Sequence, residues 1–358
     1  MKNHFQIQHY RKSDRDEVFA FLRKVYSPLD YNRLISQWDW KYDNNPFNQY
    51  PEPDILVLKD TDKIIGMEGA MPLRVSIYGK EHWATNSCDL VIDPNYRGQR
   101  LSQQLIGQYI GDHPINFSWL NEISKHVSDP FLTSQYFRLR FFIKLLDVSQ
   151  VLSKMIGHPK ISRWFGLLVA GVRPLIIPFH RRISSDKITI AQMGIFDERV
   201  DSLWRRVCSD HPVLVVRDRS YLNWRFICRP DARYIIFAAI KGDDLVGFLT
   251  LRLRERAGFS LGYLVDFMTE GKDSLPFELL VNEAIDYSRS QHAEIIISLL
   301  TTPLYRHVLY RQGFFPWRFG TQGFFRPRVD LPDQALQVFR NPRLWYLTMG
   351  DGDLEMAF

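Results

Sequence analysis

Hydrophobic positions along the chain alternate between strand-like and helix-like spacing, and their order predicts a mixed sheet flanked by helices. Residues 5–8 have the pattern of a short strand, and residues 13–25 carry apolar positions at helical spacing, with Ser13 as the expected N-cap. Four further segments continue as hairpin, strand, helix and strand: residues 55–67, 89–92, 101–110 and 115–120. Hairpins combined with strand–helix–strand units predict an α/β (α+β) fold.

The same order of elements occurs twice in the chain. Asp197, the expected cap of a second helix, follows Ser13 by 184 positions. Trp224 follows Trp40 by the same 184 positions, and both tryptophans open the pattern Trp, basic, aromatic, three variable residues, Pro. Two features at one offset indicate an internal repeat, so a packing role is expected for both tryptophans.

The repeat predicts two tandem domains, each with its own mixed central sheet. The expected boundaries are residues 1–155 and 188–358, joined by a partly apolar and basic connector at 156–187. Each domain is long enough to bury its own core. The last matched segments begin at Phe137 and Tyr310.

Charge and cysteine content narrow the classes of ligand. The net charge of +6 and the pI of about 9.1 suit polyanionic ligands, but no basic block accompanies a nucleic-acid-reading motif, so no nucleic-acid partner is expected. Three separated cysteines without a CxxC motif predict neither disulfides nor a metal site. The absence of an apolar leader favours a cytoplasmic location.

A strand–loop–helix segment carries the candidate ligand chemistry. Backbone N–H groups at a helix N-terminus bind phosphates, small residues allow close approach, and arginine adds charge-assisted contacts. The candidate cofactor-binding residues are Val91, Ile92, Arg97, Gly98, Gln99, Arg100, Leu101 and Ser102. The segment resembles the phosphate loop Arg/Gln-x-x-Gly-x-Gly/Ala of the GNAT superfamily of N-acetyltransferases, although Arg100 replaces the central glycine. The resemblance implies acetyl-CoA, or another acyl-CoA, as co-substrate.

The resemblance also implies a set of catalytic residues. Direct transfer from a thioester to an amine needs a general base and a proton donor for the leaving thiolate. Asp89 is the first candidate base, Asp266 is its counterpart in the second half, and Glu122 is an alternative base. The alternative for both aspartates is a structural role, in which they accept hydrogen bonds from the neighbouring loop or the Trp-containing segment. Tyr136 and Tyr310 are candidate acids, because the family's Tyr-x-x-Gly-Phe segment is similar to residues 310–314. The phosphate loop thus lies in the first half and the family tyrosine in the second.

The expected function is an acyl-CoA-dependent N-acyltransferase, with acetyl transfer to the amine of a small molecule, amino sugar or glycan precursor in the cleft between the halves. The alternatives are an aminoacyl-tRNA-dependent transferase of the same fold and a catalytically silent binding or scaffold protein. Residues 161–182 are expected to pack between the domains; contact with the inner membrane face is the alternative. The tail at 345–353 is expected to fold back; recognition of a cationic acceptor by Asp351 and Asp353 is the alternative.

Overall fold

The computed structural model describes residues 5–113, 115–120, 136–156, 187–271, 273–327, 341 and 344–352. The first half contains β1 (Phe5–His9), η1 (Lys12–Asp14), α1 (Arg15–Val25), α2 (Pro28–Trp38), η2 (Asp39–Asp43), β2 (Ile55–Asp60), β3 (Lys63–Ile77), β4 (Lys80–Ile92), η3 (Pro94–Tyr96), α3 (Leu101–Asp112), β5 (Ile115–Leu120), β6 (Tyr136–Leu145) and α5 (Val148–Ile156).

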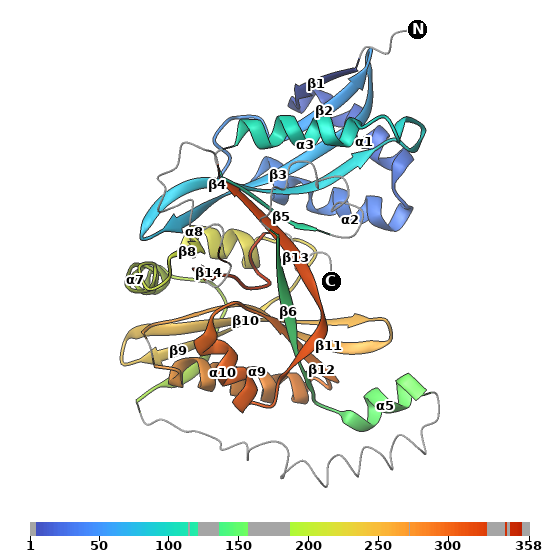
Figure 1. The fold of residues 1–358 in the computed structure, drawn as a ribbon. Helices are drawn as coiled ribbons and strands as arrows, with labels where there is room; N and C mark the ends of the chain where they lie inside the picture. Colours follow the sequence, from blue (N-terminus) through green and yellow to red (C-terminus); the bar gives the residue numbers. More distant parts are fainter. Residues whose placement is uncertain are drawn as a thin grey trace.

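The second half repeats the main order of strand, helices, hairpin, strand, helix and strand, and has β8, α10 and β14 in addition (Figure 1). It contains β7 (Thr189–Met193), α7 (Glu198–Val207), β8 (Val213–Val215), α8 (Arg219–Leu222), η5 (Asn223–Ile227), β9 (Ile235–Lys241), β10 (Asp244–Arg256), β11 (Phe259–Thr269), α9 (Leu275–Ser290), β12 (Ile295–Leu299), α10 (Pro303–Arg311), β13 (Phe315–Pro327) and β14 (Trp345–Tyr346). The predicted α/β (α+β) fold, with mixed sheets flanked by helices, is confirmed.

Within the described residues, the sheets of the two halves join into one continuous sheet of 14 strands, with the central order β4-β5-β13-β6-β12-β11. The late strands are exchanged: β13 of the second half pairs with β5, and β6 of the first half pairs with β12. The two exchanged strands also pair with each other. Exchange replaces two exposed sheet edges by paired strands, which ties the halves together through backbone hydrogen bonds.

Alternation along β2 and β3 divides the first half into two cores. One face packs Ile55, Val57, Ile64 and Met67 with residues of α1 and α2, and the other packs Leu56, Leu58 and Ile65 with residues of α3. Because successive strand residues point to opposite faces, α1 and α2 cover one side of the sheet and α3 the other. At the end of β4, Val91 therefore packs on the side of α1 and α2, and Ile92 packs on the side of α3.

The two halves meet at a reciprocal pair of tryptophans. The indole N–H of Trp40 donates to the carbonyl of Trp224 at 2.7 Å, and that of Trp224 donates to the carbonyl of Trp40 at 3.0 Å. The rings stack with centroids 5.2 Å apart. Equivalent residues contacting each other in both directions are the signature of a two-fold interface, which favours the predicted duplication and the packing role of both tryptophans.

Of the two predicted helix caps, one is confirmed and the other is wrong. Asp197 caps α7 as predicted, its carboxylate accepting from the Arg199 N–H at 3.1 Å. The prediction for Ser13 is wrong, because Ser13 lies within the short turn η1 and Asp14 precedes α1. Residues 161–182 lie outside the described residues, so their packing stays a prediction. No helix in the described ranges has both the length and the apolar character needed to cross a bilayer.

Candidate active site

A β-bulge in β4 creates the site around Asp89. The register of β4 against β3 shifts between the pairs Gly69–Cys88 and Met67–Val91, so that two β4 residues oppose one β3 residue. Asp89 lies in this bulge with a φ of 56°, a left-handed conformation that aspartate tolerates better than most residues. The bulge turns the Asp89 side chain toward α2 and η2.

Asp89 is held by two neighbours from η2. Its Oδ2 accepts from the Lys41 ammonium at 2.6 Å and from the Tyr42 hydroxyl at 2.5 Å. The Lys41 side chain is only 3% exposed, whereas that of Asp89 is 21% exposed. Both contacts use one carboxylate oxygen, so Oδ1 remains available for a hydrogen bond to a substrate amine. A partly exposed, firmly oriented carboxylate suits a general base.

β4 and β5 separate immediately before the bulge. They pair in parallel only at Thr85–Asn116 and Asn86–Phe117, while the rest of β5 pairs with β13 on its other side. Beyond Asn86, the described part of the chain places no strand against this edge of β4. The β4 backbone beside Asp89 therefore has no β5 partner, and a thioester oxygen could accept a hydrogen bond from it.

The predicted phosphate loop connects this opening to α3. Arg97, Gly98, Gln99 and Arg100 are exposed, and α3 begins directly afterwards at Leu101. The start of the loop is anchored by Asp93, whose carboxylate accepts from Lys24 at 2.5 Å and from the Asn95 N–H at 3.0 Å. The helix N-terminus and the exposed arginines together form a surface that suits a pyrophosphate.

Arg100 adopts the conformation for which the family motif uses glycine. Its φ is 59°, so its side chain carries the strain of a left-handed backbone. We expect Arg100→Gly to raise the free energy of unfolding by about 1 kcal/mol in denaturant titrations. Arg97→Gly is the matched control, because Arg97 has a φ of −67° and no such strain. Equal effects of the two substitutions would refute this explanation.

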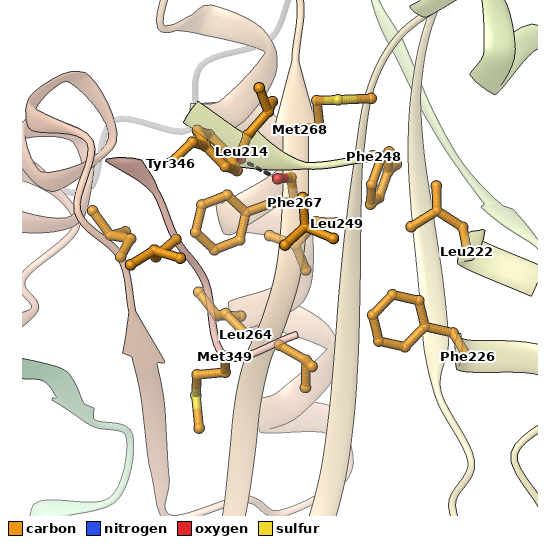
Figure 2. Close-up of a cluster of buried hydrophobic side chains, with 14 of the residues drawn as sticks. Leu214, Leu222, Phe226, Phe248, Leu249, Leu264, Phe267, Met268, Tyr346 and Met349 are labelled. Atoms are coloured by element: carbon orange, nitrogen blue, oxygen red, sulfur yellow. Dashed lines mark hydrogen bonds between the residues drawn. The ribbon is translucent and has the colours of Figure 1, made fainter. Parts of the chain in front are cut away.

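The corresponding opening in the second half is filled by the C-terminal segment. β11 and β12 pair in parallel up to Leu264–Ser298 and then separate. The segment enters between them: Leu300 bridges Thr348, and the Gly350 N–H donates to the Val265 carbonyl at 2.8 Å. Figure 2 shows Tyr346 and Met349 of this segment beside Leu264 and Phe267 of β11. The folded-back tail predicted from the sequence is confirmed.

Asp266 belongs to a closed ionic network in this filled opening. Arg217 contacts Asp266 at 3.0 Å and Asp351 at 2.8 Å, and the three side chains are at most 1% exposed. Burial raises the pKa of Asp351 to about 6, which the Arg217 charge opposes. A β-carbon on Gly350 would lie 2.9 Å from that of Asp266, so the fit is tight. The alternative role of Asp351 in acceptor binding is wrong, because this carboxylate is buried against Arg217.

The tyrosine candidates occupy different elements. Tyr136 begins β6, and its side chain lies outside the described residues, as does Glu122 altogether. Tyr310 lies near the end of α10, is 48% exposed and contacts Phe142 of β6 edge-on. Phe137 is a strand residue and Tyr310 a helical one, so the predicted equivalence of these two positions is wrong. The segments around Phe137 and Tyr310 are similar in sequence but differ in local structure.

The structure adds Lys41 and Glu68 to the site. Glu68 of β3 is 1% exposed on the α3 side of the sheet, where its Oε1 accepts from the Ser87 hydroxyl at 2.5 Å. Burial raises the pKa of Glu68 to about 7, which the Ser87 hydrogen bond and His113 oppose. The sequence singled out neither residue, but the alternative for Asp89, hydrogen bonds from the Trp-containing segment, describes its contacts with Lys41 and Tyr42. For Glu68, the signal was a charged residue inside the apolar run of β3.

The raised pKa of Glu68 has a consequence for stability. The folded protein binds the Glu68 proton more tightly than the unfolded chain does, so this contribution is lost as the pH rises from about 4.5 to 7. Relative to Glu68→Gln, we expect the wild-type free energy of unfolding to fall by about 3 kcal/mol over this range. Urea titrations at several pH values measure the difference; parallel curves for both proteins would contradict it.

A separate cavity of about 760 Å³ lies between the halves, away from the predicted catalytic residues. Most of its lining consists of residues 184 positions apart: Ser36 and Ser220, Asp39 and Asn223, Trp40 and Trp224, Asn44 and Cys228, and Pro46 and Pro230. The cavity is thus a product of the symmetric interface. None of the candidate site residues lines it, so the predicted acceptor position between the halves gains no support from this cavity.

Comparison with known proteins agrees with this geometry. Residues 6–120 match the family described as acetyltransferase (GNAT) domain. The chain has a GNAT fold. A GCN5-related N-acetyltransferase from Anabaena variabilis superposes with a TM-score of 0.61 at 13% identity, covering 90% of this chain and 73% of that one. No curated protein sequence matches the chain.

Two other solved structures resemble this chain over most of both chains. N-myristoyltransferase from Saccharomyces cerevisiae with bound myristoyl-CoA has a TM-score of 0.55 at 13% identity, covering 91% of this chain and 79% of that one. A probable N-acyltransferase from Enterococcus faecalis has a TM-score of 0.58 at 10% identity, covering 90% and 72%. The fold is therefore shared with proteins named as an N-acetyltransferase, an N-myristoyltransferase and a probable N-acyltransferase.

Proposed function

We propose that the protein is an acyl-CoA-dependent N-acyltransferase with one working site, in the opening between β4 and β5. The observation that carries the proposal is the asymmetry between the two halves. In the first half, the opening leads to an exposed phosphate loop and contains the oriented Asp89 carboxylate. In the second half, the tail and the Arg217 network occupy the equivalent space.

Each part has a role in this proposal. The N-terminus of α3 and Arg97 bind the CoA phosphates, and a β4 backbone N–H stabilises the thioester oxyanion. Asp89 accepts the proton of the attacking amine. We further propose acetyl as the acyl group and the amine of a small molecule or glycan precursor as acceptor, following the sequence resemblance. The second half is a duplicated domain that supports the first through the exchanged strands.

Calorimetric titration of acetyl-CoA into the whole protein tests the proposal. We expect saturable binding, and we expect Arg97→Glu to weaken it at least tenfold, because the charge reversal faces the phosphates. Lys241→Glu, an exposed change of the same charge in the second half, serves as the control and should leave the affinity unchanged within about twofold. An absence of binding to the wild-type protein would refute the proposed function.

A further inference from the structure

A serine hydroxyl lies at the point where β4 and β5 part. Ser87 is the first β4 residue beyond the last pair, Asn86–Phe117, and it is half-buried. The Ser118 hydroxyl donates to the Ser87 carbonyl at 3.1 Å, which fixes the backbone here. The Ser87 side chain is therefore held at the closed end of the proposed acyl-CoA opening.

Glu68 backs this hydroxyl from inside the protein. Its Oε1 accepts the Ser87 hydrogen bond, and its Oε2, although buried, has no hydrogen-bond partner among the described residues. A buried carboxyl group with one unpaired oxygen is costly as an anion and much cheaper as a neutral acid. The pair thus consists of the hydroxyl of half-buried Ser87 and the buried carboxyl group of Glu68, which can hold one proton.

The pair and Asp89 lie on opposite faces of the sheet. Asp89 contacts Lys41 and Tyr42 of η2, whereas Glu68 interacts electrostatically with Tyr109 of α3 and with His113 directly after α3. Acyl transfer needs two proton movements at different atoms, one from the amine nitrogen and one to the departing sulfur. A base on one face and an acid on the other meet this need without competing for one proton.

We propose that the Ser87 hydroxyl, supplied by Glu68, donates the proton to the leaving CoA sulfur. In this step the C–N bond forms and the C–S bond breaks, and the sulfur takes the Ser87 proton while Ser87 takes the Glu68 proton. The amine proton passes to Asp89. The proposal rests on the proposed function and gives Ser87 a catalytic role and Glu68 a positioning role.

Three titratable groups interact electrostatically with Glu68: Tyr109 of α3, His113 directly after α3, and Asp54 in the segment before β2. His113 bonds Asp54 at 2.8 Å, and both side chains remain partly accessible. In the proposal, this pair is the group through which Glu68 would exchange its proton with solvent.

Binding of CoA and of desulfo-CoA, which lacks only the sulfur, tests the proposal without a known acceptor. At about pH 6 Glu68 holds its proton, so the Ser87 hydroxyl can donate to the CoA sulfur and strengthens CoA binding selectively. We expect Ser87→Ala to weaken CoA binding about tenfold and to leave desulfo-CoA binding unchanged. Ser290→Ala, which removes an exposed hydroxyl at the end of α9, should change neither affinity.

The pH profile separates the role of Glu68 from simple packing. In wild-type protein the preference for CoA over desulfo-CoA should show an inflection near neutral pH, which Glu68→Gln should remove while retaining the fold. If wild-type protein binds both ligands and Ser87→Ala changes the two affinities equally or not at all, the assignment of Ser87 as proton donor is refuted, while the proposed function stands. If wild-type protein binds neither ligand, both are overturned.

Discussion

Asp89→Asn is expected to lower kcat by a factor of about 10² to 10⁴, with little change in the affinity for acyl-CoA. The amide cannot accept the amine proton, while the phosphate loop and the β4 backbone remain in place. Steady-state kinetics with acetyl-CoA and an accepted amine, together with calorimetry of acetyl-CoA binding, measure the two effects separately. A loss confined to acyl-CoA affinity would contradict the assignment of Asp89 as base.

Stability must be controlled in this experiment because Asp89 neutralises a buried cation. With Lys41 only 3% exposed, removing its carboxylate partner should cost about 3–5 kcal/mol of stability. The double variant Asp89→Asn/Lys41→Met removes both charges and should recover most of this loss, but not the activity. A stable double variant with wild-type turnover would show that Asp89 has only a structural role.

Arg217→Met is expected to reduce the free energy of unfolding by about 3–5 kcal/mol. The substitution leaves the carboxylates of Asp266 and Asp351 buried without their cation. Denaturant titration measures the loss. Arg219→Met is the matched control, since the ion pair of Arg219 with Asp201 is exposed, and it should cost at most about 1 kcal/mol.

A further variant tests the cause of that loss. Replacing Arg217, Asp266 and Asp351 together by apolar residues of similar size should restore much of the stability, because no uncompensated charge then remains. If Arg217→Met alone has no greater effect than Arg219→Met, the second opening is not held closed by this network. The central asymmetry of the account would then need another explanation.

The local pattern of hydrophobic and polar residues predicts the secondary-structure elements and the fold class, because strands, helices and hairpins depend on the spacing of residues that are close in sequence. The repeat at Trp40 and Trp224 even predicted two positions that contact each other. The exchange of β6 and β13 was beyond such reasoning. Pairing partners such as Phe117 and Phe325 are distant in sequence, and both alternative pairings satisfy the same alternation.

The candidate site was predictable only in part for the same reason. The phosphate loop is contiguous in sequence, so the sequence alone predicts its residues. Lys41 reaches Asp89 from another element, and Glu68 reaches Ser87 across two strands, so no short motif contains either pair. Asp266 seemed equivalent to Asp89 by position, but the tail that buries it lies 82 residues away at Thr348.

Hydrogen–deuterium exchange with and without CoA tests the central claim most directly, because it reads both openings in one sample. CoA is expected to slow the exchange of the backbone amides of residues 90–92 and 101–103, at the β4 edge and the start of α3. No change in exchange is expected at residues 264–268 of β11, which the tail already covers. Protection at residues 264–268 without protection at residues 90–103 would contradict the account.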